Sequence, residues 1–230
     1  KLLIEGVSAM SEMKRNAFVF LLWSTIAGKI SFFASAVLIA MVLSPVDFAI
    51  IDTILAGGIG GLVLGICLLK LHKIEKIALA GFVAVPIGFW GAFLLAGGLD
   101  FIFLLAGVNS EDPTISSRVN VLAIIFMGII CGMIFGAILY GRKSIWLFAA
   151  VCGVISFPCG ILVGLFNSGH PIKATLETVL AVFGPIDLNL LTIITSFGIG
   201  IGFSIGLFEK RHYFLNSTKV GRSSKTRARV

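Results

Sequence analysis

Long apolar runs dominate the chain, and short polar stretches separate them. The runs lie at about 17–43, 53–69, 77–97, 119–140, 145–166 and 189–208. Each approaches the roughly 20 apolar residues that an α-helix needs to cross the hydrocarbon core of a bilayer. The runs are continuous and do not alternate, which indicates helices and not the strands of a β-barrel. The pattern therefore predicts an all-α integral membrane protein with six transmembrane helices.

Composition agrees with this pattern. Of the 230 residues, 58% are hydrophobic and 13% are charged, and the mean hydropathy is +1.08. Soluble domains average about 25% charged residues. The chain is therefore expected to reside in a lipid bilayer.

Glycine recurs at four-residue spacing in three places, which we call the glycine ladders. The ladders are Gly57–Gly61–Gly65, Gly128–Gly132–Gly136 and Gly198–Gly202–Gly206. They begin 71 and 70 residues apart. Residues four apart share one face of a helix, and small residues on that face let a second helix approach closely. The ladders predict glycine-zipper packing faces on the even-numbered helices, and the alternative is that these smooth faces line a pore.

The recurring ladders also predict an internal repeat. Each unit would cross the membrane, turn, and return through a ladder helix, which gives three parallel-repeat helical hairpins at about 17–70, 76–141 and 143–210. A segment at 1–16 would precede this six-helix domain at 17–208, with a weak apolar face suited to the membrane interface. A basic tail at 209–230 would follow it. The moderately apolar connections 99–106 and 172–183 have the composition of short helices on the outer surface, and a re-entrant segment is the alternative for 172–183.

Two prolines interrupt apolar runs at matching places. Pro86 and Pro158 each stand 21 or 22 residues after the last glycine of a ladder. A proline inside a helix removes one backbone hydrogen bond and usually kinks the helix. We expect kinks at both positions, which would either open a central space or bend the helices around their neighbours.

Charge distribution predicts orientation. All but three of the eighteen Lys and Arg residues fall in the N-terminal segment, the connections 70–76 and 141–144, and the tail. The exceptions are Lys29, Arg118 and Lys173. Short basic segments remain on the cytoplasmic side of a membrane. Both termini are therefore predicted to be cytoplasmic, as an even number of spans requires.

The basic tail predicts a lipid contact. A juxtamembrane basic residue gains about 1 kcal/mol near an anionic lipid surface. We expect anionic headgroups to be bound by Lys210, Arg211, Lys219 and Arg222. Nucleic acid is a less favoured partner for the same residues.

Lys29 is the one charged residue deep within a predicted span. It lies about 20 Å past Arg15 at a rise of about 1.5 Å per residue, and an unpaired lysine at that depth costs at least a few kcal/mol. Three interpretations follow. Lys29 faces a polar cavity and meets an anionic solute or a proton path; or it pairs with an acid or lipid headgroup from a partner. In the third, the first span begins near Ile30 and Lys29 lies at the cytoplasmic edge.

Signals for catalysis are weak. His72, His170 and His212 fall in loops or the tail, and the four cysteines lie in apolar runs without metal-binding spacing. No nucleotide-binding, zinc-protease or serine-hydrolase motif occurs in the sequence. We expect no enzyme activity, no cofactor, no metal and no catalytic residue.

Function is predicted only by class. Few polar residues occur within the runs, while the glycine faces suit helix packing. The sequence favours a non-catalytic structural or accessory subunit that packs with other membrane protein subunits in a larger complex. The alternative is a small-solute or ion transporter or channel with Lys29 in the path.

Overall fold

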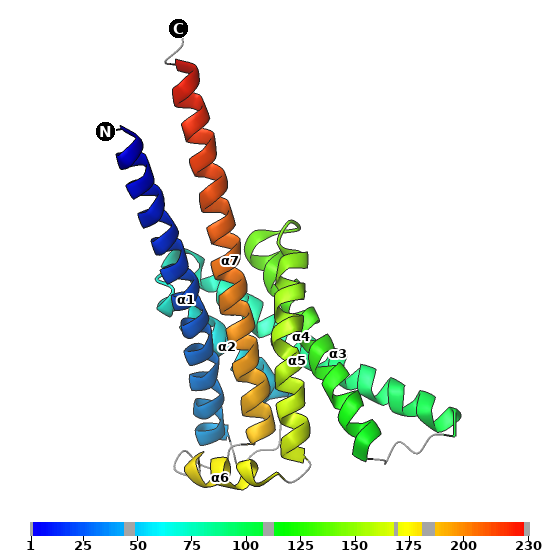
Figure 1. Ribbon diagram of the computed structural model, residues 1–230. Helices are drawn as coiled ribbons and strands as arrows, with labels where there is room; N and C mark the ends of the chain where they lie inside the picture. The colour runs from blue at the N-terminus through cyan, green and yellow to red at the C-terminus, as the bar shows by residue number, and fades with distance from the viewer. Residues whose placement is uncertain (1, 44–48, 108–112, 168–169, 181–186, 228–230) are drawn as a thin grey trace.

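The computed structural model describes residues 2–43, 49–107, 113–167, 170–180 and 187–227 (Figure 1). Every described element is a helix, which confirms the all-α class. In chain order the helices are α1 (Leu2–Leu43), α2 (Ala49–Cys67), the short 3₁₀ helix η1 (Leu71–Lys73), α3 (Ile74–Leu105), α4 (Pro113–Tyr140), α5 (Ile145–Asn167), α6 (Pro171–Leu180) and α7 (Leu188–Arg227).

Five described helices are long and apolar enough to cross a membrane, as expected of a multi-pass integral membrane protein. These candidate spans are Ala17–Ile39, Leu71–Leu105, Ile115–Tyr140, Ile145–Asn167 and Leu188–Arg211. They match five of the six predicted spans. The remaining one corresponds to a shorter apolar helix at Ile51–Cys67 within α2.

The long helices pack side by side in a closed ring. Contacts join α1 to α2, α2 to α3, α3 to α4, α4 to α5, α5 to α7, and α7 back to α1. The two chain termini lie at the same end of the bundle, and α6 crosses the opposite end (Figure 1). The prediction of a short helix within 172–183 is therefore confirmed for the described part of that segment, while its place on the outer membrane surface stays a prediction.

Apolar side chains fill the middle of this ring. Phe32 of α1 and Phe135 of α4 are fully buried, with ring centroids 6.4 Å apart in an edge-to-face arrangement. Two buried serines bond to their own helices: Ser31 donates to the Ala27 carbonyl at 2.6 Å, and Ser204 donates to the Gly200 carbonyl at 2.7 Å. Polar groups satisfied in this way add little cost to an apolar interior.

Several helices extend past the predicted span ends. Residues 2–16 do not form a separate helix, because α1 runs without a break into the first span. Residues 99–105 continue α3, and 209–227 continue α7. The charges in these segments predict where the membrane spans end, but a charge at a membrane edge does not end the helix. Lys, Arg and Glu are good helix formers.

The two prolines lie inside continuous helices. Both α3 and α5 remain helical on either side of Pro86 and Pro158. Pro86 is half-buried and Pro158 is exposed. Pro158 therefore lies on the outside of the bundle and does not line the interior. The kinks themselves stay a prediction.

Candidate functional site

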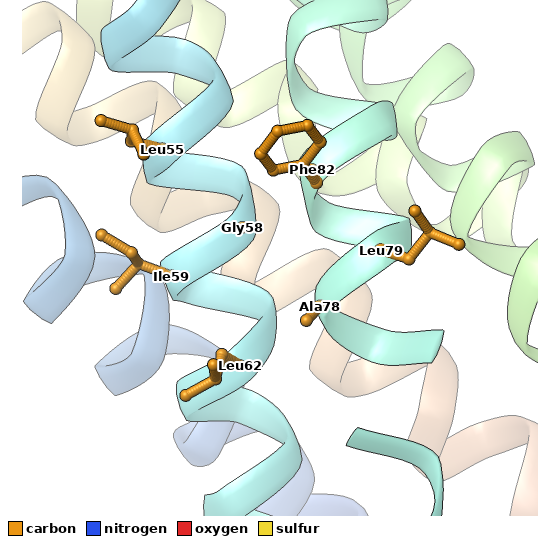
Figure 2. Close-up of a pocket in the computed structure, with 7 residues that line it drawn as sticks. All are labelled: Leu55, Gly58, Ile59, Leu62, Ala78, Leu79 and Phe82. Atoms are coloured by element: carbon orange, nitrogen blue, oxygen red, sulfur yellow. The ribbon is translucent and has the colours of Figure 1, made fainter. Parts of the chain in front are cut away.

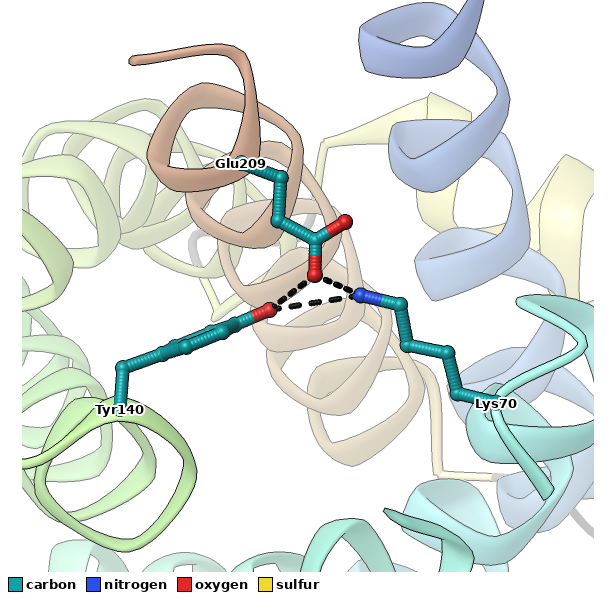
Figure 3. A network of polar contacts seen from close by, with 3 residues as sticks. All are labelled: Lys70, Tyr140 and Glu209. Atoms are coloured by element: carbon teal, nitrogen blue, oxygen red, sulfur yellow. Dashed lines mark hydrogen bonds and ion pairs between the residues drawn. The ribbon is translucent and has the colours of Figure 1, made fainter. Parts of the chain in front are cut away.

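A polar cluster joins the ends of α2 and α4 to the middle of α7, at the end of the bundle where the two chain termini lie. Figure 3 shows Lys70, Tyr140 and Glu209 converging on one point. The Tyr140 hydroxyl donates to Glu209 Oε1 at 2.6 Å, and the Lys70 ammonium forms an ion pair with the same oxygen. Lys70 Nζ also lies 3.4 Å from the Tyr140 hydroxyl. We call these three residues the end cluster.

The members of the end cluster follow the three glycine ladders. Lys70 comes five residues after Gly65, Tyr140 four after Gly136, and Glu209 three after Gly206. They are separated in sequence by 70 and 69 residues. The cluster therefore links the ends of α2, α4 and the membrane portion of α7.

The end cluster is largely buried and is bordered by aromatic rings. The Lys70 and Glu209 side chains are only 14% and 29% exposed. The Tyr140 ring packs on Phe208 with centroids 4.3 Å apart, and Lys73 Nζ lies 5.5 Å above the Tyr140 ring. Burial, and secondly the charge of Lys73, lower the pKa of Lys70 from 10.5 to about 8. At neutral pH most of the Lys70 amine is therefore protonated and can pair with Glu209.

An unusual backbone turn delivers Lys70 to the cluster. Leu69 has φ of +54°. Its N–H donates to the Ile66 carbonyl at 2.9 Å, while the Lys70 N–H donates to the Gly65 carbonyl at 3.0 Å. This pair of bonds is the Schellman motif, in which the left-handed position is usually glycine. A leucine there costs about 1–2 kcal/mol in a conformation that only glycine adopts freely.

This turn supplies a first prediction. Leu69→Gly removes the left-handed strain, and it loses little packing because Leu69 is 84% exposed. We expect the free energy of unfolding to rise by about 1 kcal/mol. The measurement is a denaturing-detergent titration in mixed micelles. The control is Leu71→Gly, at an exposed position without positive φ. Equal losses of stability in both variants would contradict the prediction.

A cavity of about 360 Å³ adjoins the end cluster. It is lined by Tyr140, Lys143, Phe208 and Glu209. Both signs of charge and two aromatic rings therefore border the same space. The Glu209 carboxylate of α7 joins Lys70, which follows α2, to Tyr140 at the end of α4. Lys143 is exposed beside this cavity.

The glycine ladders each face one neighbouring helix. A Cβ atom at Gly57 would overlap the Gly81 carbonyl of α3, and one at Gly202 would overlap the Ser24 carbonyl of α1. A Cβ at Gly132 would lie 2.7 Å from the Phe148 carbonyl carbon of α5. Glycine permits these helix contacts because it has no side chain. The other ladder members at Gly61, Gly65, Gly128, Gly136, Gly198 and Gly206 likewise face α3, α5 or α1.

Lys29 is exposed on α1. It lies within the candidate span Ala17–Ile39, so an apolar stretch long enough to cross a membrane includes it. The lysine does not line the cavity beside the end cluster. Nor does it line the apolar groove between α2 and α3. Its side chain is exposed and does not belong to the buried middle of the ring.

An open groove runs between α2 and α3 on the outside of the bundle (Figure 2). Its volume is about 470 Å³. The lining is entirely apolar: Leu55, Gly58, Ile59, Leu62, Ala78, Leu79 and Phe82. Such a surface is compatible with lipid acyl chains.

Two buried cysteines contact backbone carbonyl groups of neighbouring helices. Cys131 donates to the Ala84 carbonyl at 3.1 Å, and Cys159 lies 3.7 Å from the Thr192 carbonyl. Among the described residues, no group of three or more His, Cys, Asp or Glu side chains could hold a metal ion. The cysteines that are buried thus pack as small residues inside helices.

Only part of the predicted lipid-contact set has a described environment. Lys210 is half-buried and Arg211 is exposed, beside the end cluster. The backbone at Lys219 and Arg222 continues α7, but their side chains lie outside the described residues. Lipid contact at this end stays a prediction.

The chain matches no protein-family model, and no curated protein or solved structure is detectably similar to it. The function must therefore be argued from the residues themselves.

Sequence reasoning missed Tyr140 and Glu209, although a signal for both was present. The repeat of about seventy residues, applied to Lys70, leads to Tyr140 and then to Glu209 or Lys210. Glu209 is also an isolated acid among basic residues at a predicted membrane edge. The ladder partners Gly28 and Gly81 were missed too, because neither belongs to a four-residue glycine series.

Proposed function

We propose that this protein is a non-catalytic multi-pass membrane protein that serves as a structural or accessory subunit of a larger membrane complex. The observation that carries the proposal is Lys29, a cation exposed on the outer surface in the middle of a candidate span. An unpaired lysine in hydrocarbon costs at least a few kcal/mol. A neighbouring protein that covers α1 would remove this cost.

The interior supports the same proposal. The middle of the ring holds aromatic and aliphatic side chains, and the buried serines Ser31 and Ser204 bond within their own helices. Transport sites usually place several polar groups near the midplane, on interrupted helices. The alternative function is a small-solute or ion transporter or channel with Lys29 in the path, and the exposure of this lysine outside the buried middle of the ring makes us favour the subunit role.

The proposed architecture is six spans in three parallel hairpins with glycine-zipper contacts. Three features support it: the seventy-residue offset of the ladders, the closed ring of contacts, and the end cluster at equivalent ladder ends. The α2 ladder faces α3, the α4 ladder faces α5, and the α7 ladder faces α1. Each proposed hairpin thus docks its returning helix on the next hairpin around the ring.

We further propose that both termini and the end cluster are cytoplasmic. The excess of Lys and Arg in the connections beside this end supports the orientation. Anionic headgroups would then surround Lys210 and Arg211. Protease or tag accessibility from the two sides of sealed vesicles measures the orientation, and a terminus reached only from outside the cell would contradict it.

The mass and composition of the native particle test the subunit role. We expect the protein, gently solubilised from its own membrane, to purify at fixed stoichiometry with at least one other membrane polypeptide. Mass measurement of the intact particle and peptide identification of its components give the result. A particle that contains only this chain, as a monomer or homo-oligomer, would contradict the proposal.

A further inference from the structure

The outer face of α1 around Lys29 has an unusual chemistry. Phe18, Leu22 and Ile26 precede Lys29 by eleven, seven and three residues, so the four side chains form one stripe along the helix. All four are exposed. A stripe of large apolar residues that ends in one cation suits neither water nor lipid alone.

The depth of Lys29 prevents escape to an interface. It lies about 18 Å along the helix from Ala17 and about 15 Å from Ile39, at a rise of about 1.5 Å per residue. The span ends are therefore almost equally distant in a hydrocarbon core of roughly 30 Å. Lysines relieve their burial by reaching the headgroups when they stand near a helix end. Lys29 does not stand near the end of this span.

The described part of the chain offers no acid at this depth. Acidic residues occur in the part of α1 that precedes the candidate span, in the first turns of α2 and α3, beyond the last buried residue of α3, in α6, just before α7, and in the end cluster. These are Glu5, Glu12, Asp52, Glu75, Asp100, Glu177, Asp187 and Glu209. A second copy in the same orientation would present the same described residues at the same depths. The acidic residues of the described part of a second copy therefore do not supply a carboxylate to Lys29.

We propose that the Lys29 face of α1 docks a transmembrane helix of a different polypeptide, which carries an Asp or Glu near the middle of its span. The inference rests on the proposed subunit function and names the chemistry of the partner. The partner's apolar side chains would cover Phe18, Leu22 and Ile26, and its carboxylate would pair with the ammonium. Each ion would offset the cost of burying the other in hydrocarbon. Either helix without its partner would therefore be less stable in the membrane.

The test uses the full protein in its native membrane. A hydrophobic carbodiimide activates carboxylates within the bilayer, and a contacting amine then forms an amide without adding a spacer. We expect peptide mapping to find Lys29 joined to an Asp or Glu inside an apolar segment of another polypeptide. Exchanging the two charges, with Lys29→Asp and the partner's acid replaced by lysine, should restore the assembly that either single change loses.

Variants give the quantitative readout. Lys29→Met keeps the length of the side chain without its charge, and we expect at least a tenfold loss of co-purified partner. Lys29→Arg should retain the partner. Lys76→Met is the matched control, because Lys76 is an exposed lysine in the first turn of α3. Elution as a single sharp peak and an unchanged unfolding midpoint would show that Lys29→Met still folds.

Three results would overturn the inference. If the partner co-purifies equally with Lys29→Met, the inference fails while the subunit function stands. Amide bonds that join Lys29 only to residues of this chain would also overturn it, in favour of self-association. If the unmodified protein purifies alone, both the inference and the proposed function fail.

Discussion

Gly202→Leu is expected to disrupt the packing of α7 on α1. A Cβ at this position would already overlap the Ser24 carbonyl, and Gly202 is buried. The atom that it meets belongs to the backbone, so no rotamer change relieves the clash and the two helices must separate. Overpacking a close contact costs about 1–3 kcal/mol, and we place this leucine at or above the upper end of that range.

A matched substitution isolates the close contact from the chemical change. Gly97→Leu makes the same replacement in α3, where nothing lies within 4 Å of the added Cβ. We expect that variant to match or exceed the unmodified protein in stability, since glycine costs about 1 kcal/mol in a helix interior. Detergent unfolding titrations compare the two. Stabilities of Gly202→Leu and Gly97→Leu within about 0.5 kcal/mol of each other would show that the contact carries no energetic weight.

The same substitution tests the proposed repeat. Gly61→Leu and Gly132→Leu occupy corresponding ladder positions against α3 and α5. If the three contacts are equivalent, these variants should lose similar stability. A large loss in one and none in the others would argue that the sequence offset does not reflect equivalent interfaces.

Glu209→Gln is expected to destabilise the end cluster. The amide keeps the shape of the side chain and can still accept from Tyr140, but the Lys70 ammonium loses its counter-charge. Breaking a buried ion pair costs about 3–5 kcal/mol. Because water reaches part of this pair, we expect about 1–3 kcal/mol, between the buried and exposed cases. Unfolding measured at neutral pH gives the value.

The chain contains its own control for this effect. Lys173 and Glu177 form an exposed ion pair at 3.9 Å along α6. Glu177→Gln should change stability by at most about 0.5 kcal/mol. In a double-mutant cycle, Lys70→Met combined with Glu209→Gln should lose less than the sum of the two single variants. Strict additivity would show that the two side chains do not interact in solution.

The glycine ladders show what the sequence could not predict about helix packing. The ladders predicted which faces pack, but a four-residue series of small residues does not indicate which helix it packs against. The ladder on α7 meets α1, which is the most distant helix in sequence. Pairing of this kind depends on ring closure in three dimensions, so Gly28 and Gly81 gave no signal of their own.

Lys29 shows the same limit at a single residue. Its distance from the ends of the apolar run was visible in the sequence, because the rise per residue of a helix is constant. The direction of its side chain was not visible. The exposed stripe on α1 depends on which faces α2 and α7 cover, and a count of residues along one helix does not give those faces.

By itself, the sequence determined the all-α class, the positions of five long apolar helices, and the charge asymmetry between the two ends. These follow from hydrocarbon thickness, helix rise and the cost of burying charge, which act locally along the chain. The tertiary structure decided that Lys29 is exposed on α1 and that Lys70, Tyr140 and Glu209 meet. The first outcome depends on which faces of α1 are covered by α2 and α7, and the second depends on contacts between residues about seventy positions apart, so no local propensity encodes either.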